Sequence, residues 1–173
     1  MIVDVQEKLM PAVLEAERVI ANSLKLIHSA QRLNVPVLLT EQYPAGLGKT
    51  VQPLFEVIGN ETSVMEKTFF SAMKDKAIYD HVEELRGSGR EQVILAGAEA
   101  HVCVLQTAID LSDEGYQVYV VADAVASRVE ASLTLGLNRL MAAGVEIINS
   151  EMVLFEWIEN SDTEAFRDLR ALL

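Results

Sequence analysis

Three reactive side chains stand at the ends of three separate strand patterns in this sequence: Asp4, Lys67 and Cys103. Cys103 is the single cysteine, and it lies where the strand pattern of residues 93–96 gives way through a glycine to a helical pattern. A thiol at a helix N-terminus gains acidity from the exposed N–H groups and the helix dipole. We therefore expect Cys103 to be a nucleophile with a lowered pKa.

The three side chains are expected to converge, because the carboxyl ends of parallel strands share one edge of a sheet. There, the charge of Lys67 would favour the Cys103 thiolate, and Asp4 would accept the thiol proton and pass it to a leaving amine. Each residue alone also has a structural interpretation: a buried apolar cysteine, an aspartate in a turn, and a solvated lysine at a strand end. Their joint placement favours catalysis.

The elements that position these residues are short β-branched runs alternating with amphipathic segments. The expected strands are 1–5, 35–40, 63–66, 92–96, 117–121 and 145–148. This alternation predicts an α/β fold with a mainly parallel six-stranded sheet. A chain of 173 residues, half of them hydrophobic, suits one domain over residues 1–173.

Composition narrows the function classes. The formal charge of -12 disfavours binding to nucleic acid or to an anionic membrane. One cysteine forms no internal disulfide, and neither a secretory leader nor a membrane-spanning stretch is visible, so a cytoplasmic setting is expected. The first residues read like the end of a buried strand, which leaves open a longer native N-terminus before Met1.

The late helical segment 150–158 is apolar on several faces. The large apolar residues there are Met152, Val153, Phe155, Trp157 and Ile158. A helix of this kind usually needs a second surface to cover it, which predicts a homo-oligomer, a dimer or larger. The alternative is a helix buried inside its own chain.

Four segments resemble the isochorismatase-like cysteine hydrolases: residues 3–8, 66–72, 97–108 and 121–128. They occur in the family's order and cover nearly the whole chain. The resemblance implies a Rossmann-like three-layer α/β/α fold. It also implies an Asp-Lys-Cys catalytic triad at Asp4, Lys67 and Cys103.

The same resemblance assigns a role to the loop before the nucleophile. Family members have a non-proline cis peptide there, which corresponds to the Ala98–Glu99 bond and turns the backbone N–H groups of Glu99 and Cys103 toward a developing oxyanion. Ala100 departs from the family, in which many members carry Thr, so a hydroxyl contact to substrate is lost at that position.

No metal and no cofactor are expected. Nicotinamidases of this family bind a metal through an Asp and histidines after the second strand, whereas residues 40–44 here contain no His. The three histidines, His28, His81 and His101, show no paired ligand spacing. His101 lies two residues before Cys103, where it would contact the substrate or, as we prefer, support the loop.

Residues 40–48 resemble the branch that includes the vertebrate isochorismatase domain-containing proteins. The substrate-pocket candidates are Gln42, Tyr43, Phe69, Phe70 and Ser71, and the irregular stretch 41–51 is a lid or substrate-contact candidate. As an alternative, Phe69 and Phe70 are core aromatics.

The function expected from these residues and the resemblance is hydrolysis of an amide-like C–N bond of a small molecule, through a Cys103 thioester. One alternative is vinyl ether cleavage of the isochorismatase type, which needs no cysteine nucleophile. The other is a non-catalytic interaction protein with a redox-responsive thiol.

Overall fold

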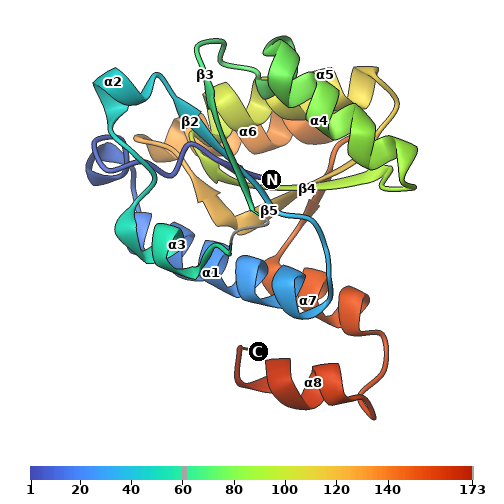
Figure 1. Cartoon of the computed structure of the whole chain (residues 1–173). Helices are drawn as coiled ribbons and strands as arrows, with labels where there is room; N and C mark the ends of the chain where they lie inside the picture. The colour runs from blue at the N-terminus through green and yellow to red at the C-terminus, as the bar shows by residue number, and fades with distance from the viewer. Residues whose placement is uncertain (60–61, 173) are drawn as a thin grey trace.

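The computed structural model describes residues 1–59 and 62–172, and these form a parallel sheet between two layers of helices (Figure 1). The strands are β1 (Ile2–Val3), β2 (Leu38–Gln42), β3 (Ser63–Lys67), β4 (Gln92–Ala98), β5 (Gln117–Ala126) and β6 (Glu146–Ile148). All pairings are parallel, in the order β3-β2-β1-β4-β5-β6. The predicted three-layer α/β/α fold with six strands is therefore confirmed.

The strand order creates a switch point at β1. The chain moves outward from β1 to β3 and then returns to place β4 on the other side of β1. In open α/β sheets, ligands bind beyond the carboxyl ends of the strands at such a point. The loops after β1 and β4 lie there side by side.

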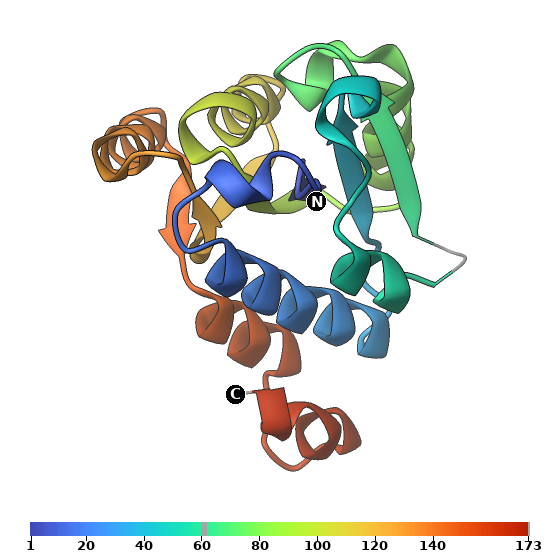
Figure 2. The same cartoon turned by 90° about the vertical axis from the view of Figure 1, so that its left-hand side faces the viewer.

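Helices cover both faces of the sheet (Figure 1). One layer is α4 (Lys76–Gly87), α5 (Leu105–Asp113) and α6 (Glu130–Ala142); the other is α1 (Ala16–Arg32), α3 (Gln52–Val57) and α7 (Ser150–Ile158). The short α2 (Pro44–Leu47) follows β2. Figure 2 shows α8 (Glu164–Leu169) outside α1 and α7, where Arg32 Nε lies 2.7 Å from Asp168 Oδ2.

The amphipathic segments form helices that bury one apolar face against the sheet. Ile27 of α1 is buried in the core on one side of the sheet, and Ile78, Ala108 and Leu140 are buried in the core on the other. Each comes from an apolar stripe at helical spacing, which packs on the β-branched residues of the strands. No helix among the described residues has both the length and the apolar character to cross a membrane.

The strands differ from the expected ranges at one or both ends, and β5 continues beyond the predicted residue 121 to Ala126. β1 ends at Val3, because Asp4 takes a left-handed conformation with φ 52°. β2 begins later than predicted and continues to Gln42, and all five of its residues are buried. The polar residues at its end have partners inside the protein, so they extend the strand where the sequence pattern shows a loop.

Helix α7 is less available for assembly than its composition predicts. Val153 and Ile158 are buried in the chain's own core, and Trp157 is partly buried against it. Only Met152 and Phe155 are strongly exposed, at 50% and 48%. The internal-helix alternative therefore holds for most of this segment, and the exposed apolar surface of α7 is limited to two side chains.

Candidate active site

Asp4 lies at the centre of the candidate site and is fully buried. Its backbone N–H donates to Thr40 O at 3.1 Å, and its Oδ1 accepts the Thr40 hydroxyl at 2.7 Å. Its Oδ2 accepts from Lys67 Nζ at 2.7 Å. The carboxylate is thus held by Thr40 of β2 on one oxygen and by Lys67 of β3 on the other.

Lys67 is the last residue of β3, and its side chain has no exposed surface. Its ammonium donates to Asp4 Oδ2 and to Gln42 Oε1, each at 2.7 Å, and lies 3.3 and 3.2 Å from the carbonyl oxygens of Phe69 and Phe70. A buried charge is tolerated only where it has such partners. The lysine is therefore held as a fixed positive charge beside Asp4.

Cys103 lies in the π-helical turn Ala100–Val104, which leads directly into α5. Such turns are common at functional sites. The side chain is nearly buried, and Asp4 and Lys67 both act on its titration through charge and hydrogen bonding. The topology thus brings the three predicted residues together from β1, β3 and the loop after β4.

The thiol is not acidic in this structure. Burial first, and the charge of Asp4 second, raise the pKa of Cys103 to about 12, although Lys67 acts to lower it. The prediction of a lowered pKa is therefore wrong for the protein without substrate. Desolvation and the adjacent carboxylate together outweigh the lysine. The sequence predicted the carboxylate beside the thiol, but it does not show the burial of the thiol.

The loop between β4 and Cys103 contains a cis peptide bond between Ala98 and Glu99. Just before it, Gly97 has φ 114°, and a Cβ at that position would lie 2.0 Å from Val3 O. Only glycine allows β4 to approach β1 so closely. The N–H groups of two later residues, 102 and 104, donate back to Glu99 O at 3.0 and 3.3 Å.

His101 and Glu99 tie this loop to the end of β5. His101 Nδ1 lies 2.9 Å from Ser127 Oγ, and Glu99 Oε2 accepts from Arg128 N at 3.0 Å and from Arg128 Nε at 2.9 Å. Helix α6 also approaches closely, because a Cβ at Gly136 would lie 3.1 Å from His101 Cα. These contacts agree with the preferred supporting role for His101.

The pocket candidates fall into two groups. Gln42 and Ser71 are buried, and among the described atoms the Ser71 hydroxyl has no hydrogen-bond partner. Tyr43, Phe69 and Phe70 are exposed by 58%, 53% and 54%. Phe69 and Phe70 are therefore not core aromatics. Their carbonyl oxygens face the Lys67 ammonium, while their side chains are available to solvent.

The stretch 41–51 lies beside the site and is held in place by hydrogen bonds. Buried Glu41 accepts from Thr50 N at 2.7 Å, from Thr50 Oγ1 at 2.9 Å and from Lys49 Nζ at 3.1 Å. Buried Gln6 donates to Gly48 O at 2.7 Å. Sequence reasoning did not identify Gln6, Glu41 or Thr40 as supporting residues; the only signal was their polar character within otherwise apolar strand patterns.

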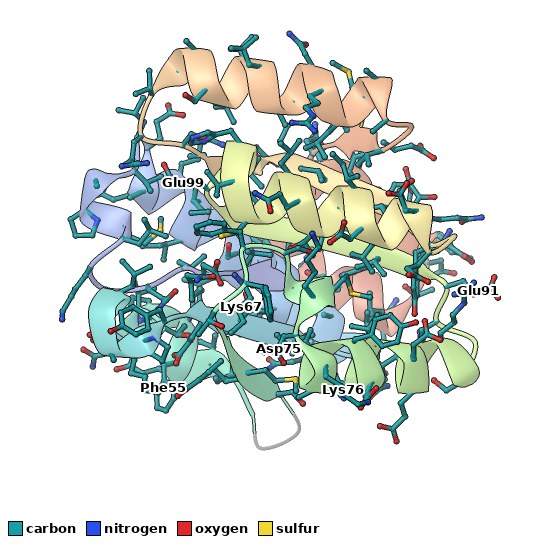
Figure 3. The ribbon with its side chains drawn as sticks, turned by 90° about the horizontal axis from the view of Figure 1, so that it is seen from above. Phe55, Lys67, Asp75, Lys76, Glu91 and Glu99 are labelled. Atoms are coloured by element: carbon teal, nitrogen blue, oxygen red, sulfur yellow. The ribbon has the colours of Figure 1, made fainter. Side chains whose placement is uncertain are left out.

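A groove of about 500 Å³ lies at the opposite end of the strands, where they begin, and is lined by Met1, Gln92 and Trp157 among others. None of the three reactive side chains lines it. Figure 3 shows the separation of the two edges, with Lys67 and Glu99 on one side and Glu91 on the other. Within residues 1–59 and 62–172, no three His, Cys, Asp or Glu residues are grouped so that they could hold a metal ion.

The parallel sheet between two layers of helices is the fold of the isochorismatase-like hydrolases. The model of the Isochorismatase domain matches residues 1–152, and the chain belongs to this family. Isochorismatase domain-containing protein 2 of Danio rerio is 36% identical over 171 residues, covering 98% of this chain and 83% of that protein. The secreted isochorismatase effector Isc1 of Phytophthora sojae is 34% identical, covering 98% and 81%.

Solved structures agree with this assignment. The MAR1 ribonuclease structure from Caenorhabditis elegans has a TM-score of 0.92 at 36% identity, covering 99% of this chain and 86% of that one. YcaC from Pseudomonas aeruginosa, described with hexane-2,5-diol and covalent acrylamide, has a TM-score of 0.88 at 26% identity, covering 99% and 86%. The family and the hydrolase fold are thus shown.

Proposed function

We propose that this protein is a cysteine hydrolase that cleaves an amide-like C–N bond of a small molecule through a Cys103 thioester. The observation that carries this proposal is the buried ion pair of Lys67 and Asp4, at 2.7 Å, acting directly on a lone thiol. A fixed carboxylate beside a neutral thiol is suited to accept a proton while the sulfur attacks a carbonyl carbon.

In the acylation step, Cys103 Sγ forms a bond to the carbonyl carbon while the thiol proton moves to Asp4. The carbonyl oxygen becomes an oxyanion, for which we propose the backbone N–H groups of Glu99 and Cys103 as donors. The C–N bond then breaks, and Asp4 returns the proton to the departing nitrogen. Ammonia or an amine leaves, and the acyl group remains on sulfur.

In the deacylation step, water attacks the thioester and Asp4 takes one of its protons. The C–S bond breaks, the acid leaves as a carboxylic acid, and the proton on Asp4 returns to Cys103. Lys67 takes no part in these transfers and holds Asp4 Oδ2 in place through its 2.7 Å hydrogen bond. Proton transfer by a positioned group of this kind typically contributes ~10²–10⁴-fold to the rate.

The comparisons support a nucleophile and add one competing function. YcaC of P. aeruginosa carries covalent acrylamide, so that relative reacts with a small amide-bearing electrophile. The C. elegans relative is named a ribonuclease. We favour the small-molecule substrate, because a net charge of -12 repels RNA phosphates.

A catalytic thiol must stay reduced, which supports a cytoplasmic setting for this chain, although the P. sojae relative is named a secreted effector.

Mass spectrometry of the intact protein, mixed with a panel of small amides and quenched in acid, tests the proposal. We expect a mass increase that equals an acyl group, maps to Cys103 and is absent in Cys103→Ala. Hydrolysis of an amide by Cys103→Ala at the rate of the unmodified protein would refute the thioester. Cleavage of a vinyl ether by that variant would instead support the isochorismatase type, and cleavage of RNA would support the ribonuclease.

A further inference from the structure

We propose that Gln42 is a positioning residue that fixes the Lys67 ammonium without placing a second negative charge near the thiol. This inference rests on the proposed cysteine mechanism, and it gives Gln42 a different role from contact with substrate. The reason is that both polar atoms of its side chain already have partners inside the protein.

The side chain of Gln42 is a bridge between an ammonium and a carbonyl group. Its Oε1 accepts from Lys67 Nζ at 2.7 Å, and its Nε2 donates to Thr68 O at 2.8 Å. An amide is the one side-chain group of this length that offers an acceptor on one side and a donor on the other. Its orientation is therefore determined by its two partners.

The backbone of Gln42 is fixed just as firmly. Gln42 N donates to Gln6 Oε1 at 2.8 Å, and Gln6 Nε2 donates to Gln42 O at 3.1 Å. Because β1 ends at Val3, the buried side chain of Gln6 pairs with the end of β2 where a neighbouring strand would otherwise do so. Through Gln42, the lysine is thus connected to β2 and to the segment that follows β1.

Neutrality of the amide matters because of the charges already present. Asp4 raises the pKa of Cys103 and Lys67 lowers it. A carboxylate at position 42 would face the same ammonium, offset its effect on the thiol, and meet Thr68 O with an acceptor instead of a donor. An apolar side chain would leave the ammonium with Asp4 and two carbonyl oxygens at 3.2 and 3.3 Å.

The rate of iodoacetamide alkylation between pH 7 and 10 reports on this arrangement, because Cys103 is the only cysteine. For Gln42→Glu we expect alkylation about 3–10-fold slower than in the unmodified protein. This follows from a rise of about one to two pKa units, partly offset by the greater nucleophilicity of a more basic thiolate. For Gln42→Met, which removes the acceptor without adding charge, we expect about threefold slower alkylation.

Two further variants separate the possible outcomes. Gln92→Glu adds the same charge at an exposed position at the other end of the sheet, and its alkylation rate should not change. Lys67→Met should slow alkylation, because it removes the charge that lowers the pKa of the thiol.

If Gln42→Met is alkylated as fast as the unmodified protein while Lys67→Met is alkylated slowly, the proposed role of Gln42 is wrong. The proposed function would not be affected by that result. Unchanged alkylation of Lys67→Met would instead refute the pairing on which the proposed function depends. If Gln42→Glu does not fold, judged by circular dichroism, Gln42→Met alone decides.

Discussion

Replacement of Asp4 by asparagine is expected to move thiol reactivity and turnover in opposite directions. The carboxylate raises the pKa of Cys103, so its removal should make the thiol more acidic. The same carboxylate is the proposed proton acceptor, so its removal should stop catalysis. Unfolding would also expose the thiol and speed its alkylation, so the comparison is made on an Asp4→Asn variant shown to be folded by circular dichroism.

The size of the effect follows from the charges around the sulfur. A charge within about 4–6 Å typically shifts a pKa by about 1–3 units, so the pKa of Cys103 should fall from about 12 to about 9–11. At pH 8 the thiolate fraction would rise ~10–1,000-fold. A less basic thiolate is also a weaker nucleophile, with a Brønsted coefficient of about 0.4–0.5. Alkylation should therefore be about 3–30-fold faster.

The assay is iodoacetamide alkylation at pH 8, followed by intact mass and paired with turnover of an amide identified as a substrate. Asp4→Asn should alkylate faster and turn over ~10²–10⁴-fold more slowly, since asparagine cannot accept the proton. Asp113→Asn removes an equal charge from an exposed position on α5 and is the matched control. Slower or unchanged alkylation in a folded Asp4→Asn variant would refute the electrostatic reasoning.

Three further predictions concern stability and assembly. Gly136→Ala should lower the free energy of unfolding in urea by ~1–3 kcal/mol, because its Cβ would lie 3.1 Å from the π-helical turn, whereas Gly87→Ala, with open space around it, should not. The free energy of unfolding should fall as pH rises from 9 toward 12, because the thiol of Cys103 loses its proton at lower pH in the unfolded chain than in the folded one. Cys103→Ser should reduce the dependence of this free energy on pH by up to about 1.4 kcal/mol per pH unit. Light scattering should give at least twice the chain mass of 19.1 kDa, and Met152→Glu combined with Phe155→Glu should lower it; a monomer before substitution would contradict the assembly.

The sequence was sufficient for the sheet and for the meeting of the reactive residues. β-branched runs at regular intervals specify parallel strands, and the ends of such strands share an edge. Asp4, Lys67 and Cys103 could therefore be placed together without coordinates. The residue types alone also predict Cys103 as the nucleophile.

The supporting network could not be predicted in the same way. Gln6 and Gln42 pair across 36 positions of sequence, and neither has a local pattern that reveals its partner. Glu41 looks like a surface residue after a strand, yet it is buried because Thr50 and Lys49 satisfy its oxygens. Polar residues at buried positions depend on contacts that only the fold supplies.

The raised pKa of Cys103 bears on the role of the two charges beside its sulfur, those of Asp4 and Lys67. If the purpose of the site were to store a thiolate, a carboxylate close to the sulfur would work against it. A carboxylate is useful when the sulfur attacks as it loses its proton, because the acceptor must then be close and must remain ionised. Lys67 Nζ donates to Asp4 Oδ2 at 2.7 Å and so places a positive charge beside the acceptor. In the proposed mechanism, the lysine holds Asp4 in place to accept the proton, in addition to its direct effect on the thiol. The opposite responses expected of Asp4→Asn and Lys67→Met in alkylation follow from the opposite charges of the two side chains, since Asp4 raises the pKa of Cys103 and Lys67 lowers it.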